Sequence, residues 1–260
     1  MANIAWFKEI SKNDIGLVGG KGLNLGIMYN LGLPVPPGFV VTAQAYKDFL
    51  IETALYDDIL ELLQGLDVED TQKLEETAQH IQDMIIAEEM PEQIKKDIVE
   101  AYKNLDINTD VFKSVSKIAL DIIKAGRDKP YVAVRSSATA EDLPQASFAG
   151  QQATFINVKG NKEVVAAVQQ CWASLFTARA IYYRVKNSFP HEKVLIAVVV
   201  QRMINSEAAG VVFTANPSTN NTDEIMIEAA FGFGDAVDAG LVNPDNYIVD
   251  KETLNIKHKK

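Results

Sequence analysis

The pattern of apolar and polar positions divides this chain into three stretches of different character. Residues 3–41 carry short apolar runs between glycines and prolines. From about residue 55 to 126 apolar side chains recur at helical spacing, and Gly126 is expected to end the last helix. After Pro130 the apolar runs become short and are bounded by turn residues, which is typical of strands. The pattern therefore predicts an α+β protein.

We expect two lobes, each built on a sheet with helices packed against it. The first lobe covers residues 1–195 and includes a helical insert at about 43–127, and the second covers residues 196–260. Thr42 is expected to cap the helix that opens the insert. Expected helices are 23–28, 43–54 and 162–186, and expected strands are 39–41, 131–134, 153–158, 194–202, 210–214, 224–228 and 247–249.

The long helix expected at 162–186 has one mostly apolar face. Cys171 lies on it and is expected in the core, because a reactive thiol needs an electropositive neighbourhood. It is the single cysteine of the chain, so no disulfide within the chain is expected and a reducing, cytoplasmic setting is the default. The residues assigned to this face are Val164, Val168, Cys171, Trp172, Leu175, Arg179 and Tyr182.

Neither end of the chain nor its apolar runs indicate a membrane protein. The first residues lack a basic segment followed by an apolar core, so no signal peptide is expected. The most apolar run, residues 194–200, is far shorter than the ~20 residues that a membrane-spanning helix needs. Its length suits a buried strand. We expect no membrane partner.

Negative charge is concentrated in one block. The chain has a formal net charge of −10, which argues against a nucleic-acid partner. Residues 52–106 hold 16 acidic and 4 basic residues, a net of −12, so the remainder of the chain sums to +2. An anion site outside the block is therefore compatible with the overall charge. The block is either a solvated helical insert or a docking face for a basic partner.

A glycine-rich turn with one lysine stands near the start of the chain. Residues 19–22 read Gly-Gly-Lys-Gly, and flanking glycines let a backbone approach a phosphate while Lys21 supplies a positive charge. The turn is not a Walker A loop, because Gly22 follows the lysine and Ile15 stands where a glycine is needed. Leu25 likewise excludes a dinucleotide fingerprint. An ordinary turn with an exposed lysine is the alternative.

A second cluster of polar residues occupies positions 135–142. Arg135 is expected at the end of strand 131–134, where a guanidinium can direct two donors at phosphate oxygens. The hydroxyls of Ser136, Ser137 and Thr139 add further donors. For the acidic pair that follows, two interpretations stay open: it neutralises Arg135 or caps a helix, or it binds magnesium. That pair is Glu141 and Asp142.

Two further segments suit a nucleotide. Residues 146–151 are small residues and a glycine between two expected strands, and they form either a loop over a triphosphate or an ordinary hairpin. Thr154 lies just beyond them. At the end of the most apolar strand, Gln201 and the backbone of Met203 offer polar partners for the edge of an adenine, although Met203 could be simple core filler.

Together these segments resemble the N-terminal ATP-grasp domain of phosphoenolpyruvate synthase (pyruvate, water dikinase), which is related to pyruvate phosphate dikinases and rifampicin phosphotransferases. The resemblance covers nearly the whole chain. It is carried, in the family's order, by Gly-Gly-Lys-Gly-Leu-Asn-Leu-Gly at 19–26, Pro-Val-Pro-Pro-Gly-Phe at 34–39, Val-Arg-Ser-Ser-Ala-Thr-Ala-Glu-Asp at 134–142, Ser-Phe-Ala-Gly-Gln at 147–151, Val-Gln-Arg-Met at 200–203 and Asn-Pro-Asp at 243–245.

The resemblance implies an ATP-grasp fold and a role for each matching residue. Lys21 and Arg135 would contact the ATP phosphates. Gln201 and the Met203 backbone would hold adenine, with Thr154 at the nucleotide. The loop over the triphosphate would consist of Ser147, Phe148, Ala149 and Gly150.

The resemblance also implies a reaction. With magnesium, ATP would phosphorylate a histidine on a separate domain, and the phosphoryl group would pass to pyruvate on a third domain. ATP, pyruvate and water would give AMP, phosphoenolpyruvate and phosphate. Lysine, arginine and Mg²⁺ can offset the negative charge of a phosphoryl transition state.

This chain departs from the family in ways that leave its metal ligands unknown and its acceptor open. We do not find in it the family's last ATP-grasp strands, which carry a glutamate and a glutamine. The phosphohistidine domain and the pyruvate domain are not found either. We therefore expect a truncated second lobe and no activity of the chain alone. Alternatives are the ATP-binding domain of a rifampicin phosphotransferase and a non-catalytic nucleotide-binding module. The three histidines, expected on the solvated surface, are His80, His191 and His258.

Overall fold

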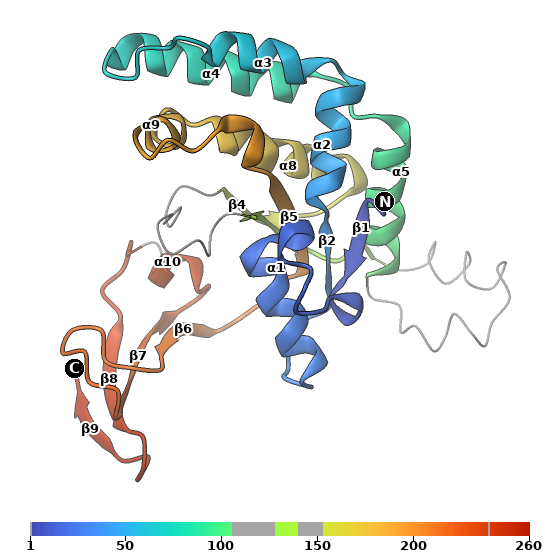
Figure 1. Cartoon of the computed structure of the whole chain (residues 1–260). Coiled ribbons are helices and arrows are strands. Elements are labelled where there is room, and N and C mark those ends of the chain that lie inside the picture. Colours follow the sequence, from blue (N-terminus) through green and yellow to red (C-terminus); the bar gives the residue numbers. More distant parts are fainter. Residues whose placement is uncertain (1, 106–127, 140–152, 239) are drawn as a thin grey trace, which may run out of the picture. The chain divides into compact units, whose positions relative to one another are not determined.

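The computed structural model describes residues 2–105, 128–139, 153–238 and 240–260, and it is an α+β structure with two antiparallel sheets (Figure 1). The chain separates into two compact units, Met1–Met203 and Ile204–Lys260. This division falls after the strand at the centre of the first sheet, whereas the sequence places the lobe boundary before that strand. The central strand belongs to the first unit because both of its neighbours are strands of that unit.

The first unit contains a five-stranded sheet in the order β1-β2-β5-β3-β4. All of its described neighbouring pairs are antiparallel. β5 lies in the middle, and its residues Ile196–Val200 are buried, which explains the uninterrupted apolar run seen in the sequence. The strands are β1 (Ile4–Trp6), β2 (Gly38–Val41), β3 (Val132–Ala138), β4 (Thr154–Val158) and β5 (Ile196–Arg202).

The helices of the first unit cover the sheet from both sides (Figure 1). α1 packs over one face, where Val18 joins Val40 and Val199 in a small core. The other helices build a larger core on the opposite face, around Phe49 and Trp172. These helices are α1 (Ile15–Asn30), α2 (Ala43–Glu52), α3 (Leu55–Leu63), α4 (Thr71–Ala87), α5 (Glu92–Asn104), α8 (Asn161–Ala173) and α9 (Ala178–Lys186), with 3-10 turns η1 (Phe7–Glu9), η2 (Ser174–Phe176) and η3 (His191–Lys193).

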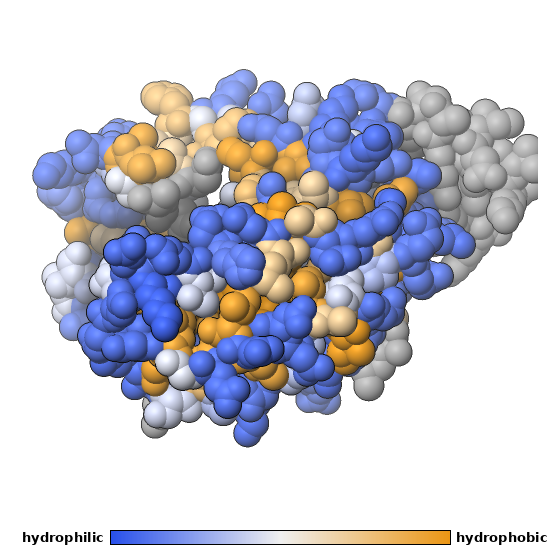
Figure 2. Space-filling view, turned by 90° about the horizontal axis from the view of Figure 1, so that it is seen from above, coloured by the Kyte–Doolittle hydropathy of each residue, from blue (hydrophilic) through white to orange (hydrophobic). Residues whose placement is uncertain are grey.

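The helical insert behaves as its sequence pattern predicts in the part that is described. Thr42 caps α2 by accepting a hydrogen bond from Ala45. The buried face of α4 is apolar, whereas several acids on the outer faces bond to a glutamine four residues earlier, as Gln79 does with Asp83. An amide leaves the carboxylate charge in place, so the block stays strongly acidic. Figure 2, seen from the side of α3 and α4, shows many hydrophilic residues with hydrophobic ones between them.

The helix predicted at 162–186 is interrupted. α8 ends at Ala173, and η2 then leads to Thr177, which caps α9. The break changes the direction of the buried face, so Ala180, Ile181 and Arg184 are buried. The prediction was right for the core positions up to Leu175 and wrong for the exposed residues Arg179 and Tyr182.

The second unit is a four-stranded antiparallel sheet in the order β6-β7-β8-β9. The short helix α10 (Asp235–Asp238) packs against β6 and β7. Lys257 forms ion pairs with Asp250 at 2.9 Å and with Glu224 at 3.6 Å, which tie neighbouring strands together. The strands are β6 (Ala208–Phe213), β7 (Glu224–Phe231), β8 (Asp245–Asp250) and β9 (Ile256–Lys259).

Among the described helices, none combines the length and the apolar character that crossing a membrane requires.

Candidate nucleotide-binding site

The glycine-rich turn lies within α1 rather than before it. Gly19 has φ 68° and ψ 173°, so the helix breaks there and a second helical segment begins at Gly20. A Cβ on Gly19 would lie 2.3 Å from the carbonyl oxygen of Ser137. Only glycine accommodates both the positive φ and this contact. The turn is thus pressed against β3, with Lys21 in the first turn of the new segment.

Hydrogen bonds through one serine join this turn to β3. The Ser137 hydroxyl accepts from the Gly22 N–H at 3.1 Å and donates to the Val18 carbonyl at 2.8 Å. Both contacts are buried, and Ser137 has no exposed surface. The segment that carries Lys21 is therefore attached directly to the strand that carries Arg135.

Arg135 lies inside β3, not at the end of a strand. The sequence predicted a strand that ends at Val134, but β3 continues to Ala138 because its later residues pair with β5. Arg135 pairs with Val199 of β5 on one side and with Thr154 of β4 on the other. Residues directly opposite in an antiparallel pair project to the same face. Arg135 and Thr154 therefore share the face on which Val199 packs with α1.

The charge of Lys21 also acts close to β3. Cys171 is buried with its Sγ 3.8 Å from the Val134 carbonyl, and burial raises the pKa of its thiol. The positive charge of Lys21 opposes this rise in the Cys171 pKa. Cys171 is a core residue, as predicted, and its raised pKa argues against a reactive thiol.

The hydroxyl groups next to Arg135 serve the fold. Ser136 donates to the Ala153 carbonyl, Ser137 to Val18 and Thr139 to Leu195, at 3.1, 2.8 and 3.0 Å. The sequence presented them as donors to phosphate. They point to backbone carbonyls instead because β3 extends through Ala138 and buries both serines.

The residues expected at adenine lie where β5 ends. Gln201 is on the same face of the sheet as Val199, two residues further along the strand, and its Nε2 donates to the Pro36 carbonyl at 3.1 Å. The Met203 N–H donates to the Tyr131 carbonyl at 2.9 Å. Arg135 lies opposite Val199 of β5, so Gln201 is two residues, or about 7 Å, further along that strand.

Several expected site residues fall outside the described part of the chain. These are Ser147, Phe148, Ala149 and Gly150 of the predicted phosphate loop, and the acidic pair Glu141 and Asp142. Among the described residues no cluster of three or more histidine, cysteine, aspartate or glutamate side chains could hold a metal ion. The described residues thus provide cationic and amide groups suited to a nucleotide, and they assign no ligand to magnesium.

His191 is not the solvated residue that its sequence context suggested. Its Nδ1 accepts a hydrogen bond from Arg184 Nε at 3.0 Å, and burial together with that guanidinium lowers the pKa of His191 to about 4. Arg184 is almost fully buried and also donates to the Leu175 carbonyl. This pair supports the helical layer, because Arg184 of α9 is hydrogen-bonded to Leu175 of η2 and to His191 of η3.

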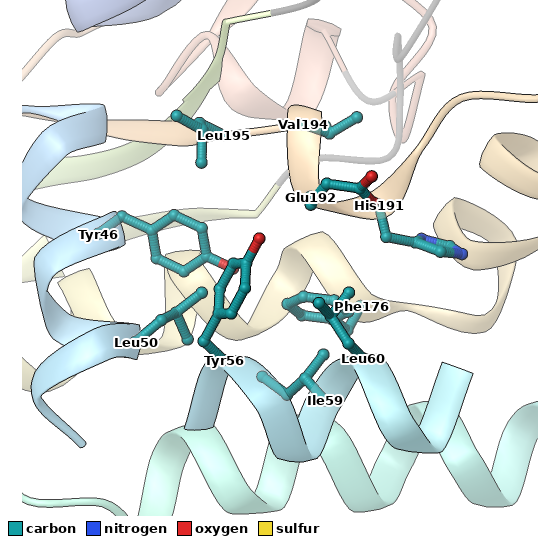
Figure 3. A pocket seen from close by; sticks show the side chains of 10 residues that line it. All are labelled: Tyr46, Leu50, Tyr56, Ile59, Leu60, Phe176, His191, Glu192, Val194 and Leu195. Carbon is teal, nitrogen blue, oxygen red and sulfur yellow. The ribbon is translucent and has the colours of Figure 1, made fainter. Parts of the chain in front are cut away.

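A mostly apolar pocket lies beside this pair, among α2, α3, η2 and η3 (Figure 3). In Figure 3 the rings of Tyr46 and Tyr56 lie next to each other, and the His191 ring points away from them. The cavity of ≈ 20 Å³ has room for about one water molecule and is too small for a nucleotide. No residue predicted for the site lines it. Its lining consists of Tyr46, Leu50, Tyr56, Ile59, Leu60, Phe176, His191, Glu192, Val194 and Leu195.

Comparison with known proteins assigns the chain to a family. The family described as "Pyruvate phosphate dikinase, AMP/ATP-binding domain" matches residues 15–260. The match covers nearly all of the chain, so this protein belongs to that family. The two antiparallel sheets and the helical insert agree with the ATP-grasp-like organisation predicted from the motifs.

Curated relatives of this chain include phosphoenolpyruvate synthases. A probable phosphoenolpyruvate synthase of Methanocaldococcus jannaschii is 51% identical over 259 residues, which are 100% of this chain and 20% of the relative. A second, of Methanothermobacter thermautotrophicus, is 50% identical over 96% of this chain and 34% of its own length. The phosphoenolpyruvate synthase of Pyrococcus furiosus is 46% identical over 98% of this chain and 33% of its own length. This chain thus spans about a fifth to a third of these relatives.

Proposed function

We propose that this chain is the ATP-binding domain of a phosphoenolpyruvate synthase. It would bind ATP with Mg²⁺ and donate a phosphoryl group to a histidine of a separate domain. The group would then reach pyruvate, so that ATP, pyruvate and water yield AMP, phosphoenolpyruvate and phosphate. The setting is cytoplasmic, and the chain alone does not complete the reaction. Family membership supports ATP as the ligand, and the names of the relatives support phosphoenolpyruvate as the product.

One structural observation carries the proposal. The turn that holds Lys21 is hydrogen-bonded to β3 through Ser137, two residues from Arg135, on the sheet face that α1 covers. This attachment would bring two cations from distant parts of the sequence, Lys21 and Arg135, towards one region. A polyphosphate is the ligand that needs such a pair, because lysine and arginine offset the charge on its oxygens before and during phosphoryl transfer.

Thr154 and Gln201 extend the proposed site in two directions. Thr154 stands beside Arg135 on β4, where it would meet the polyphosphate. Gln201 and the Met203 carbonyl lie where β5 ends, where they would meet the adenine edge. Ser147, Phe148, Ala149 and Gly150 lie outside the described residues, and the proposal assigns them to a loop that would cover the triphosphate.

Calorimetric titration of the purified chain tests this function. We expect ATP to bind in the micromolar range and GTP to bind more weakly, because Gln201 and Met203 would select the adenine edge. We also expect no ATP consumption by the chain alone. Absence of ATP binding at millimolar concentration would overturn the proposal, and ATP turnover without any added domain would remove the role of a separate acceptor.

A further inference from the structure

The helical segment that carries Lys21 begins without a cap of its own. The first N–H groups of a helix have no partner within it and are commonly satisfied by a side chain at the N-cap position. Here the break at Gly19 makes that residue the N-cap of the segment that starts at Gly20, and glycine has no side chain to offer. The missing acceptor has to come from another part of the fold.

Ser137 of β3 takes the place of that cap. Its Oγ accepts from Gly22, the third residue of the new segment, which is the N–H that an N-cap side chain normally binds. The same hydroxyl donates to the carbonyl of Val18, the last residue before the break. One buried hydroxyl thus satisfies a donor after the break and an acceptor before it. Because the group is buried, its loss leaves both backbone groups without a partner.

The contact also fixes the distance between turn and strand. A Cβ on Gly19 would lie 2.3 Å from the Ser137 carbonyl oxygen and 2.4 Å from its Oγ, so the backbone of the turn rests directly on this residue. Lys21 stands in the sequence between Gly19 and Gly22, and Ser137 contacts both of these glycines. Arg135 projects from the same face of β3, two residues earlier.

We propose that Ser137 is a positioning residue that holds Lys21 at the distance from Arg135 at which both cations reach one polyphosphate. The hydroxyl does not itself bind the nucleotide, since its hydrogen bonds go to Gly22 and Val18. It acts through Lys21, by capping the helix segment in place of Gly19. The inference rests on the proposed function, because it presupposes that Lys21 contacts ATP.

The test is a double-mutant cycle with ATP affinity as the readout. Ser137→Ala is expected to weaken ATP binding about tenfold. In a Lys21→Ala background the same substitution is expected to change the ATP affinity less than twofold, because the residue through which Ser137 acts is already gone. A merely structural role predicts instead that the two losses multiply.

Thr42→Ala is the matched control. Thr42 is also buried, caps α2 by accepting from Ala45, and donates to the Ala2 carbonyl, so it makes the same kinds of bond away from the glycine turn. It should lower the melting temperature and leave ATP affinity within twofold of wild type. If Ser137→Ala does not fold, Ser137→Cys keeps a weak donor and acceptor and should show an intermediate loss of affinity.

The outcomes separate the two proposals. Suppose that the wild-type chain binds ATP, that Lys21→Ala weakens this binding, and that neither Ser137→Ala nor Ser137→Cys does. This result would overturn the positioning role and leave the proposed function standing. The positioning role would also be overturned if Ser137→Ala weakened ATP binding by the same factor with and without Lys21. Absence of ATP binding by the wild-type chain would overturn both.

Discussion

Arg184 and His191 form a hydrogen bond in which the arginine Nε donates to the histidine Nδ1 over 3.0 Å. The guanidinium is buried, and its Nη2 has no hydrogen-bond partner among the described residues. Burial lowers the pKa of Arg184 to about 10, which leaves it charged at neutral pH. His191 can accept this bond only while Nδ1 is unprotonated, so the pair depends on a neutral imidazole.

Acid is therefore expected to destabilise the first unit through His191. The pKa of His191 is about 4 when folded and 6.5 when unfolded, so between these values the unfolded chain binds more protons. The contribution of this pair to stability is complete above pH 6.5 and is lost as the pH falls towards 4. Urea unfolding followed by tryptophan fluorescence measures this, because Trp6 and Trp172 both lie in the first unit.

His191→Asn is the control for that experiment. The asparagine Oδ1 can accept from Arg184 and does not titrate, so the variant should lose less stability than wild type between pH 6.5 and 4. Carboxylates titrate alike in both proteins and cancel in the comparison. Parallel losses in wild type and variant would show that His191 contributes nothing.

Gly19→Ala is expected to destabilise the first unit by at least about 2 kcal/mol, because it combines a positive φ with a collision against Ser137. Gly16→Ala in the same helix meets nothing within 4 Å. That variant should be as stable as wild type or slightly more stable, since alanine is the better helix former. Urea midpoints by tryptophan fluorescence compare the two, and equal stability of both variants would contradict the close contact at Gly19.

Cys171 is expected to resist thiol reagents in the folded chain. The side chain is fully buried, and burial raises the pKa of its thiol, so little thiolate forms at neutral pH. A colorimetric disulfide reagent should modify it within minutes in denaturant and over hours without it. Stoichiometric modification of the native chain within minutes would place Cys171 at the surface.

The local pattern of the sequence was sufficient for several of the elements but not for the contacts between them. It predicted the central strand, the Thr42 cap and the core position of Cys171, because each depends on neighbouring residues. The cap on Gly22 comes from a residue 115 positions away, which no local pattern can reveal. The same limit explains Arg135, which was placed at a strand end because the pairing of β3 with β5 was not visible.

His191 was wrongly predicted to be a solvated surface residue. A histidine after Phe-Pro in a turn has the local features of a surface residue, yet a buried arginine from α9 makes it an acceptor. The break between α8 and α9, which turns Arg184 inward, was not predicted. Roles for single residues such as Lys21 remain predictions from the sequence, whereas the Arg184–His191 hydrogen bond became visible only in the fold.

The central claim is that Lys21 and Arg135 act on one polyphosphate, and calorimetry with ATP and AMP tests it most directly. Lys21→Ala and Arg135→Ala should each weaken ATP binding at least tenfold, about 1.4 kcal/mol. AMP, which lacks the β- and γ-phosphates, should be affected less. Exposed residues of the same types, in Lys47→Ala and Arg179→Ala, should leave ATP affinity unchanged. Wild-type ATP affinity in both Lys21→Ala and Arg135→Ala would contradict the account.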